Sequence, residues 1–288
     1  MPNFLFWNLY GKQRSRREIR SRRLLESLTR IVSSREIDFL IFAECMTEPD
    51  VLQRALDSAA TGSYHRVATR ASKTQVWTRW PKNRIAVKYD SIDRLTVFEI
   101  ELPRSPNLLL MTCHLPDRSS QPTEADRQDR VSRHIVPEIR RIEDFEGHSR
   151  SVLVGDLNMN PYEAGMVAAS GLNSMMTRIL ADSMSNSTTR SGSRCFYNPM
   201  WSLFGDRSGG PSGSTFWARG TGSNHFWQMY DQVLLRPQVA DALLELQLID
   251  TDGADTFVTK QGRPRKALWS DHLPLYFRLN DVVYRGPN

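Results

Sequence analysis

The chain has 288 residues, of which 40% are hydrophobic and 24% are charged, a composition typical of globular proteins. That balance excludes a fibrous repeat, a largely disordered chain and a disulfide scaffold. No apolar run reaches the roughly 18 residues of a membrane span, so we expect no membrane segment. Cys45, Cys113 and Cys195 are an odd, scattered set, and the N-terminus lacks a secretory pattern. We therefore expect reduced thiols and a cytoplasmic protein.

The net charge of +6 is concentrated near the N-terminus, because residues 1–40 alone contribute +5. Basic residues are also biased, with 32 arginines among the 38 Lys and Arg. The planar guanidinium group suits phosphate oxygens, so the bias is compatible with a nucleic-acid partner. A GC-rich genome and a solvated helix face explain it equally well, and the same face could contact a protein partner.

The first half of the chain predicts one helix and several buried strands. An apolar run at residues 4–9 precedes a basic stretch, and apolar residues at helical spacing then predict a helix over about residues 14–34. Residues 38–44 form a continuous apolar run ending in a carboxylate, as in a strand buried on both faces. Further strand-like runs cover residues 84–89, 95–102 and 108–115.

The second half continues the interleaving of helices and strands. An amphipathic stripe predicts a helix over residues 123–143, and residues 151–154 predict a strand. Residues 215–219 and 226–235 read as a hairpin, residues 239–248 as a helix or an ending turn, and residues 273–279 as a final strand. We expect a mixed α/β protein in which residues 1–288 form a single domain.

Polar side chains recur where the apolar runs end. A polar group at the end of a buried strand can reach a cleft while the strand holds it rigidly. Each has a plain structural alternative: Asn8 as a turn residue, Glu44 as a helix N-terminal charge, His114 as a core histidine. Several strand ends of the same kind nevertheless indicate one shared site. Its members are Asn8, Glu44, His114, Asp156, Asn158, Asp271 and His272.

The residue types at these positions indicate phosphate-ester hydrolysis. Glu44, Asp156 and Asp271 offer hard oxygen ligands with no cysteine–histidine pattern beside them, which suits Mg²⁺ or Mn²⁺. His114 and His272 could donate to a developing oxyanion. Carboxylates for a metal and imidazoles for charge are what the attack of water on phosphorus requires.

Six short motifs resemble the endonuclease/exonuclease/phosphatase superfamily in their order along the chain. They are FWN at 6–8, FAE at 42–44, TCHLP at 112–116, GDLNMNP at 155–161, YDQVLL at 230–235 and WSDHLP at 269–274. The resemblance implies a four-layer α/β sandwich, in which two packed mixed sheets are flanked by helices and carry the active site at one edge. It also implies a divalent-metal-dependent phosphodiester hydrolase.

The resemblance further implies catalytic roles for individual residues. Asp156 would orient or deprotonate the attacking water, and Asn158 would hold the phosphate. His272 would stabilise the transition state, with Asp231 fixing its tautomer. His114 would contact the scissile phosphate or the leaving group.

For the metal, the resemblance implies Mg²⁺, with Mn²⁺ as a substitute. Glu44 would bind it with Asn8 next to it, and Asp271 would lie near it or near a second metal position. All of these residues are present, which disfavours a binding module with a dead site.

The substrate follows from what the chain lacks as well as from its motifs. YDQV stands where inositol 5-phosphatases carry a different element, an abasic-site tyrosine has no clear counterpart, and no lipid anchor is visible. We therefore favour a nuclease acting on DNA or RNA, with a phosphatase for a small phosphoester or a lipid head group as the alternative. We expect Arg118, Trp201 and Trp217 to contact the substrate, although the aromatic rings could equally pack as core.

Overall fold

The computed structural model describes residues 1–10, 17–59, 62–70, 73–92, 94–118, 120–185, 194–207, 209–216 and 226–280. Its helices are α1 Arg17–Arg35, α2 Pro49–Ala59, α3 Glu124–Arg130, α4 Val136–Glu146, α5 Ala164–Val167, α6 Arg178–Ser185 and α7 Pro237–Ala240. Two 3₁₀ turns, η1 Lys82–Arg84 and η3 Pro199–Leu203, and one π-helical turn, η2 Val131–Ile135, complete the set.

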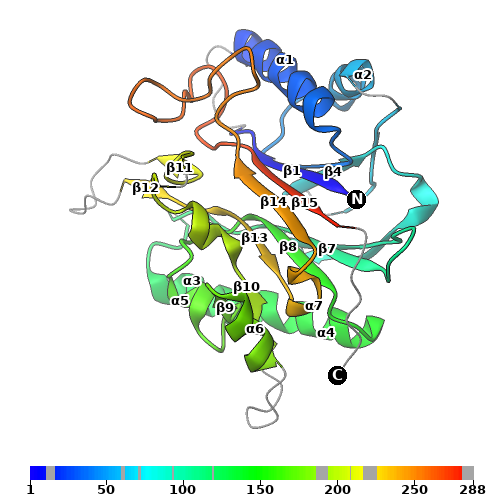
Figure 1. Cartoon of the computed structure of the whole chain (residues 1–288), viewed down its shortest axis with the longest axis vertical. Coiled ribbons are helices and arrows are strands. Elements are labelled where there is room, and N and C mark those ends of the chain that lie inside the picture. The colour runs from blue at the N-terminus through cyan, green and yellow to red at the C-terminus, as the bar shows by residue number, and fades with distance from the viewer. Residues whose placement is uncertain are drawn as a thin grey trace.

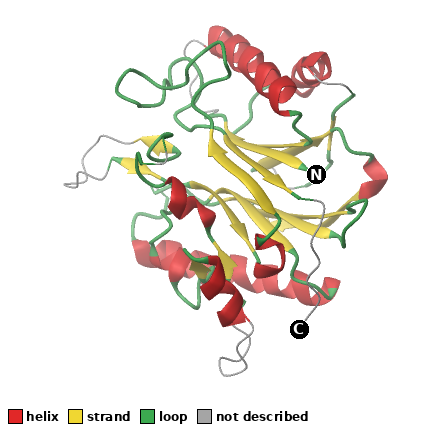
Figure 2. Ribbon diagram, in the orientation of Figure 1, coloured by secondary structure: helices red, strands yellow, loops and turns green. Residues whose placement is uncertain are grey.

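Two large mixed sheets lie face to face (Figures 1 and 2). One sheet contains, in spatial order, β14 Leu243–Leu248, β15 Leu275–Leu279, β1 Asn3–Asn8, β2 Phe39–Ala43, β4 Thr74–Thr78 and β3 His65–Arg66. The other contains β5 Ile85–Ile92, β6 Leu95–Ile100, β7 Leu108–His114, β8 Ser151–Asp156, β13 Asp231–Leu235, β10 Phe196–Tyr197 and β9 Ser174–Met175. A small ribbon pairs β11 Thr215–Phe216 with β12 Trp227–Gln228.

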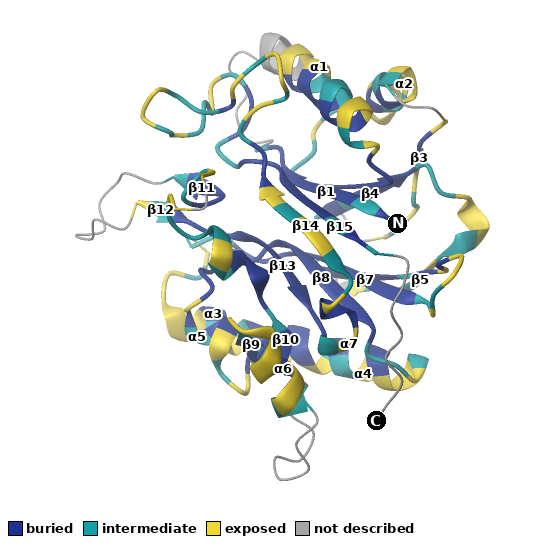
Figure 3. Cartoon of the chain, in the orientation of Figure 1, coloured by how far each residue is buried: buried dark blue, intermediate teal, exposed yellow. Residues whose placement is uncertain are grey.

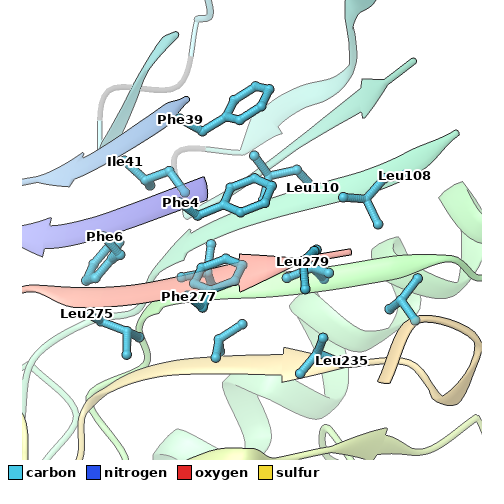
Figure 4. Packing of buried hydrophobic residues seen from close by; sticks show 14 of the residues in the cluster. Phe4, Phe6, Phe39, Ile41, Leu108, Leu110, Leu235, Leu275, Phe277 and Leu279 are labelled. Atoms are coloured by element: carbon cyan, nitrogen blue, oxygen red, sulfur yellow. The ribbon is translucent and has the colours of Figure 1, made fainter. Parts of the chain in front are cut away.

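The core between the sheets follows from the two-residue period of a strand. Phe4 and Phe6 of β1 point toward the other sheet, where residues such as Leu110 and Val152 meet them. Figure 4 shows this layer, in which Phe4 stacks on Phe277 of β15 with ring centroids 4.6 Å apart. One face of every central strand is thereby removed from water.

The alternate residues of the same strands bury the helices. Leu5 and Trp7 of β1 pack with the apolar stripe of α1, which includes Leu28. On the far side of the second sheet, residues of η2 and α4 such as Ile139 pack on β7 and β8. Helices therefore cover both outer faces, with buried inner sides and exposed outer sides (Figure 3). The expected four-layer sandwich is confirmed.

Most of the expected elements are present with small changes at their ends. The first helix begins at Arg17 in the described part of the chain, while residues 14–16 of that prediction lie outside it. The expected helix over 123–143 is present as α3, η2 and α4 in succession, interrupted by the π turn. Several elements carry no prediction from sequence, among them α2, α5, α6, β3, β4, β9 and β10.

Two of the expectations were wrong. The helix or ending turn expected at residues 239–248 is instead the end of the short α7 followed by the edge strand β14, because pairing with β15 outweighs the local helical spacing. The second hairpin arm, 226–235, divides into β12 and β13, which join different sheets. Its backbone leaves the hairpin where Asn160 Oδ1 accepts from Met229 N (2.9 Å) and Ser214 Oγ accepts from Tyr230 N (3.1 Å). The residues expected to join the hairpin, 220–223, lie outside the described part of the chain.

Two further observations bear on the sequence analysis. None of the helices in the described segments is long and apolar enough to cross a membrane. Cys45, Cys113 and Cys195 are free thiols.

Candidate active site

Three adjacent strands place three polar side chains in one row. His114, Asp156 and Asp231 belong to β7, β8 and β13, and the strand register sets His114 opposite Asp156 and Asp156 opposite Asp231. All three are buried, with exposed fractions of 7%, 2% and 0%. The spacing of neighbouring strands, about 5 Å, therefore brings together three titratable groups that are far apart in sequence.

The glycine before Asp156 is required by the close approach of β7. A Cβ on Gly155 would lie 1.7 Å from the carbonyl oxygen of Cys113, so no side chain fits there. Gly155 thus lets the two strands come together directly beneath the row.

Asn8, the last residue of β1, joins the other sheet to this row. Its Nδ2 donates to Asp156 Oδ2 at 2.9 Å, while its Oδ1 accepts from Tyr10 N at 3.0 Å. The Ser270 hydroxyl donates to the Asn8 carbonyl oxygen at 2.6 Å. Asn8 is therefore held from several sides and orients the Asp156 carboxylate.

His272 and Asp231 form a hydrogen-bonded pair within the site. His272 Nδ1 lies 2.7 Å from Asp231 Oδ2, and its other ring nitrogen, Nε2, faces Asp156 Oδ2 at 4.0 Å. Burial lowers the pKa of His272, but Asp231, Asp156 and Asp271 outweigh burial and raise it to about 10. The pair therefore favours a positively charged imidazolium at neutral pH.

Glu44 and His114 line the site from the two facing sheets. His114 Nε2 lies 3.8 Å from Glu44 Oε1 and 3.9 Å from Asp156 Oδ2. Glu44 follows β2 with a left-handed backbone (φ 50°), a conformation that is costly for a side chain and recurs at functional sites. Its position opposite His114 completes a ring of acidic and imidazole groups.

Asn158 occupies the turn directly after β8. Its backbone is also left-handed (φ 50°), and its N–H donates to Asp156 Oδ1 at 3.0 Å. Its Nδ2 donates to the carbonyl oxygen of Leu115 at 3.0 Å, which ties the turn to the end of β7. One amide hydrogen is thus used structurally, and the side chain is fixed beside the row.

Two observations on the described residues bear on where a divalent cation could bind. The first concerns one set of groups, in which Glu44 Oε2 and Asp271 Oδ1 are buried oxygens without a hydrogen-bond partner among the described residues. Such orphaned hard oxygens are costly unless a cation or water satisfies them. In the second set, ligand atoms of Asp156, Asp231 and His272 lie within 4.8 Å of one another. The donors of both sets fit a small hard cation, although Asp231 already binds His272 Nδ1 in the second.

The residues expected to bind the substrate have different environments. Arg118 forms an ion pair with Glu163, and its guanidinium carbon lies 5.1 Å from the centroid of the Tyr230 ring. Trp201, in η3, is half-buried and contacts the exposed ring of Tyr162 at 6.4 Å between centroids. Trp217 lies outside the described residues.

Three residues that hold parts of the site in place by hydrogen bonds were not predicted from the sequence as members of the site. Ser214 Oγ accepts from the backbone N–H of Asp231 at 3.0 Å, and Ser270 Oγ accepts from that of His272 at 3.1 Å. Asn160 Nδ2 donates to Gln228 Oε1 at 2.6 Å. Ser270 and Asn160 lie inside the SDH and GDLNMN motifs, which is the signal that could have found them, whereas Ser214 lies in a plain Gly/Ser stretch.

Comparison with known proteins agrees with this architecture. No curated protein sequence matches the chain. Among solved structures, the humanized TDP2 of D. rerio has a TM-score of 0.56 at 17% identity, covering 97% of this chain and 98% of that chain. A family protein from Leptotrichia buccalis (TM-score 0.57, 11% identity, 97% and 100% coverage) is similar. So is an AP endonuclease from Archaeoglobus fulgidus (TM-score 0.53, 14% identity, 97% and 100% coverage).

At these identities the likeness concerns the fold alone. The family model described as "Endonuclease/Exonuclease/phosphatase family" matches residues 5–272, a range that runs from before Asn8 to His272 and so includes the residues of the candidate site. Because that match spans nearly the whole chain, the protein belongs to the endonuclease/exonuclease/phosphatase family of metal-dependent phosphoesterases.

Proposed function

We propose that residues 1–288 act as one catalytic domain, a divalent-metal-dependent phosphodiesterase that cleaves nucleic acid. The observation that carries the proposal is the row of His114, Asp156 and Asp231, completed by His272 and by the unpartnered oxygen of Glu44. The choice of nucleic acid is supported by two relatives of the fold, a D. rerio TDP2 complexed with single strand DNA product and the AP endonuclease.

Mg²⁺, with Mn²⁺ as a substitute, is the metal that the donor set favours. Glu44 and Asp271 would hold it through their orphaned oxygens, with Asn8 next to it. When bound, such an ion supplies positive charge to a non-bridging phosphate oxygen or to the leaving oxygen. This assignment leaves the Asp231–His272 pair intact, whereas a metal on the second set would compete with that hydrogen bond.

The remaining residues would divide the work of a one-step attack of water on phosphorus. Asp156, held by Asn8 and by the Asn158 N–H, would orient the water and take its proton. His272, kept cationic by Asp231, would stabilise the charge that develops on the phosphoryl oxygens. Asn158 and His114 would hold the phosphate and the leaving group from the β7 side.

The experiment is cleavage of end-labelled single- and double-stranded DNA and RNA in the presence of Mg²⁺, Mn²⁺ or EDTA. Asp156→Ala is the inactive variant, and Asp182→Ala, at an exposed aspartate of α6, is its matched control. We expect metal-dependent cutting by the wild type and the control and none by Asp156→Ala. The product ladder distinguishes an endonuclease from an exonuclease.

A small diester, bis(p-nitrophenyl) phosphate, is assayed in parallel. Hydrolysis of that diester without cutting of any polymer would keep the phosphodiesterase chemistry and overturn the nuclease. A chain that cuts polymers equally well in EDTA would overturn the metal assignment.

A further inference from the structure

The loop between β14 and β15 has an acidic base that is anchored to α1. Ile249 N donates to the carbonyl oxygen of Pro274 at 2.8 Å and closes the loop. Arg30 of α1 pairs with both Asp252 and Asp255, each at 2.8 Å, and the Asp252 side chain has no solvent exposure. Two of the acidic side chains of the loop are therefore held at its base, against α1. The loop is drawn in orange beside α1 in Figure 1.

The outer part of the loop, residues 259–266, has only basic charge. Its turn is fixed by hydrogen bonds from Thr259 N to Arg263 O and from Gly262 N to Thr259 O, both 2.8 Å. We call its four cations the basic tip: Lys260, Arg263, Arg265 and Lys266. All but the half-buried Arg265 are exposed, and within the described structure none of the four has an ion pair. Four cations held together without a counter-ion are unfavourable until an anion arrives.

The basic tip is attached to the wall of the candidate active site. The guanidinium carbon of Arg263 lies 4.6 Å from the ring centroid of Phe216 in β11. The neighbouring Thr215 forms a bridge with His272, and its hydroxyl donates to the carbonyl oxygen of Asp271 at 2.8 Å. In Figure 1 this loop and the β11–β12 ribbon project on the same side of the molecule.

The chain between the basic tip and His272 is also rigidly held. Trp269 is buried, and its Nε1 donates to Ser27 Oγ of α1 at 2.9 Å. Leu268 and Trp269 donate their backbone N–H groups to the carbonyl oxygen of Arg265. The tip thus has a fixed position relative to the His272 side of the site.

We propose that the basic tip binds backbone phosphates of a nucleic-acid strand that extends from the site past His272. This inference rests on the proposed function and identifies the surface that would favour a polymer over a small phosphoester. Guanidinium and ammonium groups on a preformed turn suit phosphate oxygens, and each phosphate they neutralise releases counterions. The tip would therefore contribute to polymer affinity and to its salt dependence.

The test compares variants that remove two positive charges each. Arg263→Ala with Lys266→Ala removes part of the tip, and Lys260→Ala with Lys266→Ala does so while leaving the Arg263–Phe216 contact. Lys82→Ala with Arg104→Ala is the matched control. These two exposed cations precede the first residues of β5 and β7, whereas the candidate active site lies at the last residue of β7. Binding of labelled DNA and RNA oligonucleotides is measured by fluorescence anisotropy in EDTA at increasing KCl, and cleavage of polymer and small diester is measured separately.

We expect both tip variants to bind oligonucleotides several-fold more weakly. The plot of the logarithm of the binding constant against the logarithm of the salt concentration has a negative slope. This slope should become shallower by about 1 for each phosphate that the variant no longer neutralises. The ratio of polymer to small-diester hydrolysis should fall with it, and the control should keep the wild-type slope. Equal slopes in the tip variants and the control would overturn the tip, even if the wild type cuts polymers.

The binding titrations test the proposed role of the basic tip even if the protein cleaves no nucleic acid. A wild type that binds oligonucleotides through the tip but cuts none would overturn the nuclease and keep the tip. A wild type that binds no oligonucleotide would overturn the tip, and the cleavage assay would still decide the phosphodiesterase.

Discussion

Two clusters of buried polar side chains lie at the two ends of β8, and they differ in how their carboxylates are hydrogen-bonded. At the start of the strand, Arg236 makes a two-pronged ion pair with Glu143 at 2.8 and 3.0 Å, and Ser151 donates to Glu143 at 2.7 Å. At the end of the strand, oxygens of Glu44 and Asp271 have no hydrogen-bond partner in the described segments. The same strand thus supports one cluster whose carboxylate is hydrogen-bonded on both oxygens and one whose carboxylates are not.

The comparison distinguishes polar groups that stabilise the fold from those of the candidate active site. The Glu143 carboxylate is enclosed by Arg236, Ser151 and Arg194, so removing it would leave the buried Arg236 without its described ion-pair partner. Around Asp156, oxygens of Glu44 and Asp271 have no hydrogen-bond partner in the described segments, so removing one of these two carboxylates should cost little stability and most of the activity. Variants at the two ends of β8 should therefore fail in opposite assays.

The largest expected effect is on turnover at the candidate active site. His272→Ala removes the cation that would stabilise the transition state, so we expect the rate to fall by roughly 10³–10⁴-fold. The melting temperature should fall less than in a variant of the other cluster, because burial raises the pKa of Asp231, which can take up a proton when His272 is lost, whereas Arg236 cannot lose its proton. A rate within about tenfold of wild type, which is below the usual loss for one such donor, would remove His272 from the site.

Glu143→Ala should produce the opposite result at the other end of the strand. We expect the free energy of unfolding to fall by about 3–5 kcal/mol, because the buried Arg236 would lose its only described ion-pair partner. Glu138→Ala on the same helix, which breaks the partly exposed pair with Arg141, is the control and should cost at most about 1 kcal/mol. Chemical denaturation measures both, and equal losses would show that the buried cluster has no special structural weight.

Asp231→Asn tests a positioning residue. Its effect on the rate should be smaller than that of His272→Ala. Asparagine keeps the shape of the side chain but removes the negative charge that keeps His272 protonated, so we expect a roughly 100-fold loss of rate. The ¹⁵N chemical shifts of the His272 ring should change from those of an imidazolium toward those of a neutral ring. A rate loss with unchanged ring shifts would mean that Asp231 acts in some other way.

The smallest expected effect concerns a half-buried cluster on the outer strands of the same sheet. Lys88 of β5 pairs with Glu99 at 2.9 Å and Glu146 at 2.8 Å. Burial raises the pKa of Glu99, but hydrogen bonds from Asn107 and Lys88 outweigh it and lower the pKa below its usual value. A lowered carboxyl pKa stabilises the fold above the unfolded pKa, about 4.3, and this stabilisation is lost as the pH falls through the folded pKa.

Lys88→Met should therefore lower the free energy of unfolding by about 1 kcal/mol or less at neutral pH. The difference from wild type should shrink as the pH falls below about 4. Urea denaturation at several pH values measures it, and a difference that does not depend on pH would assign the effect to packing of the lysine stem.

Local pattern predicted most of the long strands and the positions of several candidate site residues, because both depend on residues adjacent in sequence. Asn8, His114 and Asp156 follow apolar runs directly, and a strand end fixes where such side chains emerge. Long-range contacts could not be predicted in this way. Ser214 supports Asp231 through a backbone N–H 17 residues away, and β14 is a strand only because β15 pairs with it.

The basic tip could not be predicted from the net charge, for a related reason. The sum over residues 41–288 is only +1, because acidic residues elsewhere, including Asp252 and Asp255, offset the tip in any total. In the fold, Arg30 draws those two aspartates to the base of the loop and leaves the cations at its outer end. Net charge depends on composition alone, whereas the field at a surface depends on where each charge is held.

The lack of space for a side chain at Gly155 limits which substitutions this protein can tolerate. The carbonyl oxygen of Cys113 occupies the place where a first side-chain carbon would have to go. A single methyl group at that position would force β7 and β8 apart and separate His114 from Asp156, although neither residue had been altered. Among all single substitutions, some of the most harmful should thus be those that add an atom beneath the site without touching any of its chemistry.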